Sequence, residues 1–276
     1  MRDGAESPGY LWPHLHMFTT LRKRYSDWII RSAFQRVSRK RLLLEALKGD
    51  DVECACCGGH FLAFMPFGTP KNRRPHALCP QCGTLPRHRL MWMFLKERTD
   101  LMKKPMRLLH VAPETFYFNT FSKHPLVDYV AGDKFMPGYA YAPGTIDLDI
   151  TAIRYPDASF DAVICSHVLE HVPDDVQGMR ELCRVLKPGG FAIIQVPMLP
   201  GLERTAEDAT ITDPVERERR FGQHDHFRIY GLDLKDRLAS AGFHVEVVPF
   251  TARFSKQEMF RYGLPADEDV YFCTKP

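Results

Sequence analysis

Four of the eight cysteines occur as two pairs with the spacing of metal ligands. Two residues separate Cys54 from Cys57 and Cys79 from Cys82, and 21 residues lie between the pairs. Such pairs are typical of a zinc ribbon, in which each pair forms a tight turn and four thiolates bind one ion. Four thiolates leave no open position for catalysis, so the pattern predicts a structural Zn²⁺ site. Cys56 lies inside the first pair, and we expect it to be a bystander.

The residues around the pairs are consistent with this site. Gly58 and Gly83 each follow the second cysteine of a pair, where glycine permits the turn. His60 and His76 are the alternative ligands.

A basic triplet, Arg87-His88-Arg89, follows the second pair at the start of a helix expected from Pro86 to about Lys96. The stretch from Phe61 to Lys96 contains no Asp or Glu. Arginines at a helix N-terminus attract anions, so one hypothesis is that Arg87 and Arg89 contact an anionic substrate group. The alternative is that they support a domain interface.

Two further motifs lie close together in the second half of the chain. They read Phe160-Asp-Ala-Val-Ile-Cys-Ser-His-Val-Leu-Glu-His-Val-Pro-Asp174 and Arg184-Val-Leu-Lys-Pro-Gly-Gly190. Together they resemble the class I S-adenosylmethionine-dependent methyltransferases, in particular the large group with a "HVLEHV" pattern. With Cys-Pro-x-Cys-Gly and Arg-His-Arg upstream, the chain is also similar to a bacterial subgroup with a zinc-binding front end. The similarity covers about Met106 to Pro276.

The resemblance implies a binding site for S-adenosyl-L-methionine. Asp133 matches the acidic residue that holds the ribose hydroxyls, and Asp149 matches the contact to the adenine amino group. Ile150 would offer its backbone N–H to the adenine ring, and Lys134 adjoins Asp133. Ser166 and His167 end a strand and would face the cofactor or the substrate, because ligands of open α/β sheets bind at the carboxyl ends of strands.

The chain departs from the family in the first motif, which usually contains three glycines after an acidic residue. Here it reads His110-Val-Ala112-Pro113-Glu114, so the loop expected to hold the methionine part of the cofactor has a variant form. We hypothesise that Glu114 pairs with the α-ammonium of the cofactor. The alternative is a glutamate that only favours the start of a helix.

A hydroxyl acceptor needs a general base, and histidine is the usual choice near neutral pH. His226 is the favoured base, with Asp225 beside it, and His167 is a second catalytic candidate. His171 and His224 are further candidates, although His171 is expected to be structural. Arg228 is predicted to hold an acidic group of the substrate.

These residues must be positioned by alternating strands and helices. Apolar strands are predicted at 107–111, 127–131, 145–150, 160–165 and 191–196, followed by a final antiparallel pair at 244–250 and 269–274 without a crossover helix between them. Amphipathic helices are predicted at 25–48, 173–186 and 232–241. The pattern predicts an α/β fold with a Rossmann-like, doubly wound, mostly parallel sheet.

We therefore predict three regions. A basic helical segment covers 1–50, a zinc-binding module with a linking helix covers 51–100, and the methyltransferase domain covers 101–276. The polar segment at about 199–229 is expected to form a lid over the acceptor.

Composition limits the class of protein. Hydrophobic residues make up 45% of the chain, net charge is +3, and no apolar run is long enough to span a bilayer. Met1 to Tyr10 lacks a signal-peptide pattern, so we expect a cytoplasmic enzyme. The favoured reading is O-methylation of a small molecule or saccharide, with an anionic substrate and a homo-oligomer as options. The alternatives are an RNA methyltransferase and a non-enzymatic, zinc-dependent scaffold.

Overall fold

The computed structural model describes residues 37–276, apart from Asp267. The predicted helix at 25–48 lies partly outside these residues, and its described part is helical from 37 to 46. Leu44 and Leu47 pack against the small core that surrounds the cysteine pairs, whereas Val37 and Leu42 are exposed. No helix in the described part of the chain combines the length and the apolar content of a membrane span.

The centre of the molecule is a seven-stranded sheet with the order β12-β13-β9-β8-β5-β6-β7. Its strands are β5 (Met106–Val111), β6 (Val127–Asp133), β7 (Ile146–Asp147), β8 (Phe160–Ser166), β9 (Leu186–Gln195), β12 (His244–Val248) and β13 (Val270–Thr274). β13 runs antiparallel to both of its neighbours, and the other pairings are parallel. The predicted mostly parallel sheet with an antiparallel last strand is confirmed.

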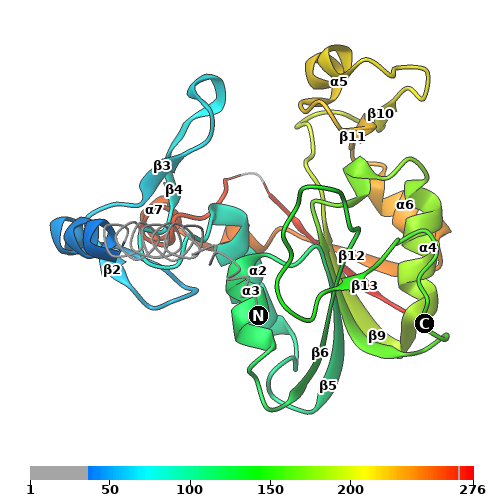
Figure 1. Cartoon of the computed structure of the whole chain (residues 1–276), viewed down its shortest axis with the longest axis horizontal. Helices are drawn as coiled ribbons and strands as arrows, with labels where there is room; N and C mark the ends of the chain where they lie inside the picture. The colour runs from blue at the N-terminus through cyan, green and yellow to red at the C-terminus, as the bar shows by residue number, and fades with distance from the viewer. Residues whose placement is uncertain (1–36, 267) are drawn as a thin grey trace, which may run out of the picture.

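Helices cover both faces of this sheet, as a doubly wound fold requires (Figure 1). On one face, α4 (Asp175–Val185) and α6 (Leu234–Ser240) bury Met179, Leu182 and Leu238 against the strands. On the other face, α2 (Pro86–Arg98) and α3 (Thr115–Phe121) bury an aromatic layer. Burial of each such side chain stabilises the fold by roughly 1.5–3 kcal/mol, so the two cores hold the strands of the sheet in place.

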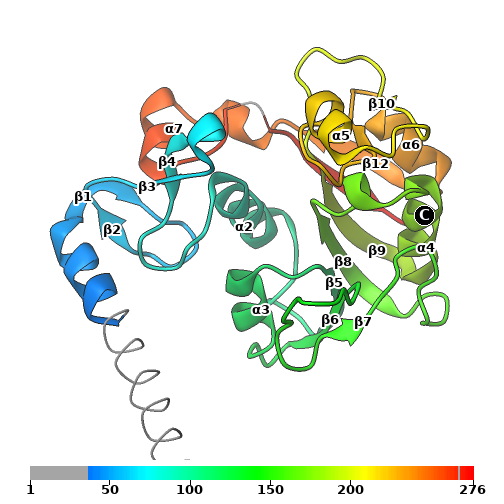
Figure 2. The ribbon, with the colours of Figure 1, turned by 45° about the horizontal axis from the view of Figure 1, so that its top comes forward.

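The two cysteine pairs lie in a smaller unit beside the sheet, the cysteine module (residues 48–85). It consists of two hairpins, β1 (Lys48–Glu53) with β2 (His60–Phe61) and β3 (Met65–Phe67) with β4 (Arg74–Leu78). A short 3-10 helix, η1 (Pro70–Asn72), joins the strands of the second hairpin. Figure 2 shows the module separated from the sheet by α2. Val52, Phe61 and Phe64 form its core together with Cys54 and Cys79.

The connection between β12 and β13 differs from the prediction. We expected no helix there, but the chain forms η3 (Phe250–Arg253) and α7 (Lys256–Tyr262) before it returns to the sheet. α7 packs against the cysteine module: the Arg261 guanidinium donates to the Asp50 carbonyl, and the ring of His76 stacks on Phe260 at 4.4 Å. The end of the chain therefore ties the cysteine module to the sheet.

The polar segment at 199–229 contains β10 (Ala206–Glu207), α5 (Pro214–Phe221) and β11 (Arg228–Ile229). β10 and β11 form a separate two-stranded pair, and Figure 1 shows this segment projecting past one edge of the sheet. Phe221 is buried, so the end of α5 is anchored, while most of the segment is exposed.

Candidate functional site

The strand order reverses between β5 and β8, because β6 and β7 follow on one side and β9 on the other. In an open parallel sheet, a reversal of this kind opens a crevice at the carboxyl ends of the strands, where ligands bind. Two residues at this edge have the left-handed backbone that favours glycine, Ala112 after β5 (φ 48°) and His167 after β8 (φ 55°). Strained backbone of this kind concentrates at functional sites.

A cavity of about 390 Å³ lies beside β6 and β7, and both predicted carboxylates line it. Asp133 ends β6, and burial raises the pKa of its carboxyl. Asp149 accepts from Lys134 Nζ at 2.7 Å and from the Thr151 hydroxyl at 2.7 Å, and these bonds lower its pKa to about 2. Ile150 also lines the cavity. The residues predicted to bind the adenosine part of a cofactor are therefore brought together.

The variant loop after β5 holds Glu114 in a fixed position. Its Oε2 lies 3.2 Å from His110 Nε2, and its Oε1 lies 3.4 Å from His88 Nε2. Burial acts to raise the pKa of Glu114, but the contacts of its carboxylate with His110 and His88 outweigh burial and hold the pKa well below its usual range. Glu114 precedes α3 without capping it. Its carboxylate joins the loop to α2, which neither sequence hypothesis anticipated.

A second cavity, of about 320 Å³, is lined by His167, Gln195 and Glu268. Several buried polar atoms near it have no hydrogen-bond partner within the described residues: Ser166 Oγ, His167 Nε2, Glu170 Oε2 and Gln195 Oε1. Buried polar atoms in proteins are nearly always paired, so an unpaired group of this size indicates a place where a ligand or water binds. Ser166 ends β8 and His167 follows it, and a contact of either with a cofactor or substrate stays a prediction.

His226, the favoured base, is placed differently from the expectation. Its ring is only 7% exposed, and it is not among the residues that line either cavity. Its Nδ1 lies 2.9 Å from the carbonyl oxygen of Phe221, and burial lowers its pKa. The ring packs edge-on against His171, with ring centroids 4.7 Å apart. This geometry favours a fixed neutral imidazole over a base that meets the substrate directly.

Two of the three predicted substrate arginines are occupied elsewhere. Arg89 is fully buried and donates to the carbonyls of Thr84, Ala77, Tyr262 and Gly263. Arg228 donates to Glu207 and to the carbonyls of Leu169, Val172 and Pro173. The donors of Arg89 and Arg228 thus already satisfy buried acceptors, and a substrate contact by either residue stays a prediction.

Arg87 remains a candidate for an anionic group. Its Nε is buried without a partner in the described residues. Burial lowers the pKa of Arg87, although the negative charges of Glu114 and Glu268 act to raise it.

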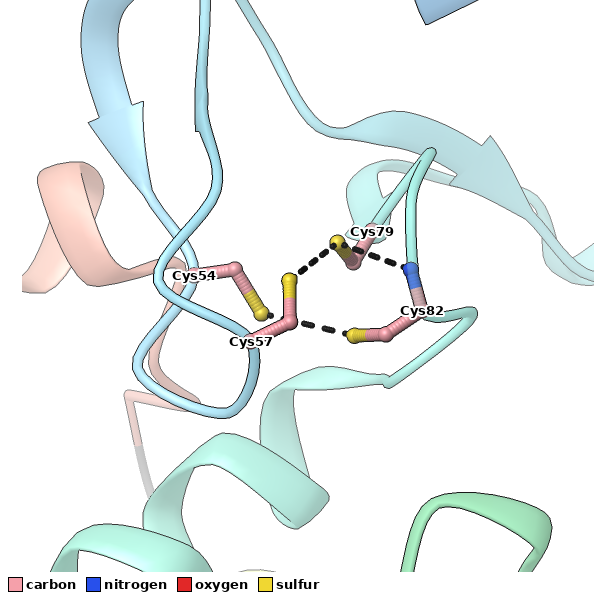
Figure 3. A group of neighbouring side chains, drawn as sticks. All are labelled: Cys54, Cys57, Cys79 and Cys82. Carbon is pink, nitrogen blue, oxygen red and sulfur yellow. Dashed lines mark hydrogen bonds between the residues drawn. The ribbon is translucent and has the colours of Figure 1, made fainter. Parts of the chain in front are cut away.

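The four predicted cysteines converge, with their sulfur atoms within 4.8 Å of one another. Figure 3 shows the thiols turned toward a common centre. Cys54 Sγ lies 3.6 Å from Cys82 Sγ, and Cys57 Sγ lies 3.8 Å from Cys79 Sγ. Tetrahedral Zn²⁺ with sulfur ligands at about 2.3 Å requires sulfur separations of about 3.8 Å. The donor set therefore fits zinc.

The local backbone repeats at both pairs. Gly58 N–H donates to the Cys54 carbonyl, and Gly83 N–H donates to the Cys79 carbonyl, each from a left-handed glycine. Cys56, His60 and His76 lie outside the four-sulfur group: Cys56 Sγ faces the His88 carbonyl, His60 pairs with Asp50, and His76 bonds to the Phe260 carbonyl.

Sequence reasoning missed Gln195 and Glu268. Gln195 ends β9, so the rule that ligands bind at the carboxyl ends of parallel strands could have selected it. Glu268 accepts from Gln195 Nε2 at 2.9 Å. Glu268 precedes β13, which runs antiparallel to β9. The start of β13 therefore lies at the edge of the sheet where the parallel strands end, and this position follows only from the direction of β13.

Comparison with known proteins gives a consistent picture. Residues 128–194 match a family described as "Methyltransferase domain". The demethylmenaquinone methyltransferase of Deinococcus radiodurans is 32% identical over 122 residues, which cover 37% of this chain and 48% of the relative. The 27-O-demethylrifamycin SV methyltransferase of Amycolatopsis mediterranei is 43% identical over 63 residues, covering 21% and 23%. The chain thus spans about half of the first relative and less of the second.

Solved structures are also similar to this chain. An S-adenosylmethionine dependent methyltransferase from Mesorhizobium loti has a TM-score of 0.44 and 20% identity, covering 67% of this chain and 98% of the other. Residues 128–194 therefore resemble a methyltransferase domain, and both of these sequence relatives are methyltransferases by name.

Proposed function

We propose that this protein transfers a methyl group from S-adenosyl-L-methionine to an oxygen atom of a small molecule or saccharide. One observation carries the proposal. Asp133 and Asp149 line the same cavity at the reversal of strand order, within the segment that matches the methyltransferase family. Carboxylates in this position suit a ligand with a diol and an amino group, which adenosine provides.

In this proposal Asp133 accepts hydrogen bonds from the two ribose hydroxyls. Its raised pKa reflects a half-buried carboxylate that such bonds would compensate. Asp149 and the backbone of Ile150 hold the adenine ring, with Lys134 beside them. Ala112 and Pro113 follow β5 and hold the methionine part. Because its carboxylate contacts His110 and His88, we assign Glu114 to positioning this loop and no longer to the α-ammonium.

The acceptor is proposed to occupy the second cavity. The sulfonium of the cofactor is a strong methyl donor by itself, so the protein must align the acceptor and exclude water. His167 lines this cavity and Ser166 precedes His167 in the chain, while the segment at 199–229 supplies Leu199 and Pro200 to the lining. The Amycolatopsis relative is named a 27-O-demethylrifamycin SV methyltransferase, and the O-demethyl part of that name supports an oxygen acceptor.

The four cysteines are proposed to hold one structural Zn²⁺. Cys54 and Cys79 are buried, and the converging sulfurs leave no room for a substrate ligand at the ion.

Isothermal titration calorimetry with S-adenosylhomocysteine tests the cofactor site. We expect binding by the wild type and a roughly ten- to hundredfold loss in Asp133→Asn, because a charged hydrogen bond contributes about 1.5–3 kcal/mol. Asp128→Asn is the matched control, since Asp128 lies at the other end of β6 and pairs with Arg107 on the surface. An absence of binding by the zinc-loaded wild type would overturn the proposal.

A further inference from the structure

Glu170, His171 and His226 form a second cluster of side chains that could bind a metal ion, separate from the four cysteines. One ligand atom from each lies within 4.8 Å of the other two. Glu170 and His171 belong to η2 (Leu169–His171), directly after β8, and His226 precedes β11. Glu170 is 1% exposed and His226 is 7% exposed. The fold therefore brings two imidazoles and a carboxylate together from segments more than fifty residues apart.

One ring nitrogen of each imidazole has a polar partner outside the cluster, by a hydrogen bond for His226 and by an ion-pair contact for His171. His226 Nδ1 lies 2.9 Å from the Phe221 carbonyl oxygen, which can only accept, so Nδ1 carries the proton. His171 Nδ1 lies 3.1 Å from Asp225 Oδ2. Each ring thus keeps the lone pair of Nε2 free. Metal-binding histidines in proteins are held in this way, with the other ring nitrogen donating to a carbonyl or a carboxylate.

The carboxylate of Glu170 lacks the partner that its burial requires. Its Oε2 is buried without a hydrogen bond, and within the described residues its ion-pair contacts are His167 Nδ1 at 3.4 Å and His171 Nε2 at 4.0 Å. No lysine or arginine of the described chain pairs with it. A buried carboxylate is costly unless a cation or strong donors compensate it.

We propose that Glu170, His171 and His226 bind a divalent transition-metal cation. Two imidazoles and one carboxylate are the ligand set of open metal sites, which keep positions for water or substrate. His171 lines the cavity assigned to adenosine, while His167, beside Glu170, lines the cavity assigned to the acceptor. A cation here would lie between the two and bind an oxygen of the acceptor.

This inference goes beyond the proposed function, because it concerns metal binding that is measurable without cofactor or acceptor. It gives His226 a role as a ligand and Asp225 a role as a positioning residue. The cation would hold the acceptor oxygen and favour its deprotonated form.

Titration of the zinc-loaded protein with Mn²⁺, followed by electron paramagnetic resonance, and with Co²⁺, followed by absorption, tests the site. Zn²⁺ stays on the four thiolates because Mn²⁺ and Co²⁺ bind more weakly than Zn²⁺ there. We expect one additional equivalent of either ion, with the weak absorption of nitrogen and oxygen ligands for Co²⁺. No additional equivalent of either ion, or Co²⁺ with only thiolate bands, would overturn the proposal.

The variants separate the site from general surface binding. His226→Ala and the nearly isosteric Glu170→Gln should each bind the ion at least tenfold more weakly, and Asp225→Asn about ten- to hundredfold more weakly. The exposed His224, two residues from His226, supplies the control, and His224→Ala should bind as the wild type does. Wild-type affinity in folded Glu170→Gln would contradict the assignment. Calorimetry with S-adenosylhomocysteine on the same samples reports the proposed function separately.

Discussion

Glu114 Oε1 lies 3.4 Å from His88 Nε2, across the boundary between the loop after β5 and the helix that follows the second cysteine pair. His88 Nδ1 in turn lies 3.1 Å from the Leu85 N–H, at the edge of the cysteine module. A short chain of contacts therefore joins the proposed zinc site to the proposed cofactor loop, which gives the cysteine module a way to stabilise that loop.

Replacing Glu114 by Gln should lower the free energy of unfolding at neutral pH by about 1–3 kcal/mol, because the carboxylate loses its charged hydrogen bond with His110 and its ion-pair contact with His88. Urea denaturation measures this difference. Glu97→Gln is the control, since Glu97 pairs with Arg253 on the exposed surface and should change stability little.

The same pair of proteins should show a particular pH dependence. The pKa of Glu114 is lower in the folded protein than its ordinary value of 4.5, so its stabilisation is fully present above about pH 4.5. It is lost as the pH falls from there toward the folded-state pKa. The difference between wild type and Glu114→Gln should therefore shrink in acid; a constant difference would argue against the role of the charge.

Variants of two adjacent cysteines, Cys56 and Cys57, test the zinc site. Cys57→Ser removes one of four converging thiols and should lower the zinc content, measured by plasma mass spectrometry, and expose residues 48–85 to proteolysis. Cys56→Ser changes the neighbouring thiol, which faces the His88 carbonyl, and should keep zinc. Equal zinc content in the two variants would contradict a four-cysteine site.

Local rules predicted the parts of the molecule that depend on short sequence signals. The cysteine spacing predicted which four side chains converge, and the resemblance to the methyltransferases placed Asp133 at the end of a strand. α7 was missed although Ser255 and Glu258 form a capping box and Gly263 ends the helix with a left-handed backbone. That signal was present, but seven residues give too short an apolar period to recognise.

The contacts that the sequence could not predict involve partners that are distant in the chain. Arg89 has the sequence context of an anion-binding arginine, but four carbonyls from three segments surround it. The predicted strand at 145–150 is only Ile146–Asp147, because β7 is an edge strand that pairs with β6 alone. No local pattern reports such tertiary contacts.

Truncation of Arg89 should destabilise the protein much more than truncation of Arg87. Arg89→Ala leaves carbonyls of the cysteine module and of the segment around Tyr262 without donors, and should lower the free energy of unfolding by about 3–5 kcal/mol. Arg87→Ala should change stability far less, because its Nε has no partner in the described residues. Thermal and urea unfolding compare them, and a larger loss in Arg87→Ala would reverse the assignment.

Ala112 occupies a left-handed position where the methyltransferases that this chain resembles have glycine. A non-glycine residue in this conformation is strained by about 1–2 kcal/mol. Glycine avoids the strain but loses more conformational entropy on folding than alanine does, which costs roughly 0.5–1 kcal/mol. Ala112→Gly should therefore raise the free energy of unfolding by up to about 1 kcal/mol in urea denaturation. Ala131→Gly, at a buried β6 position of ordinary strand geometry, should lower it. A loss of stability in both would mean that the alanine side chain contributes packing that outweighs its strain, and that the variant loop is built around that methyl group.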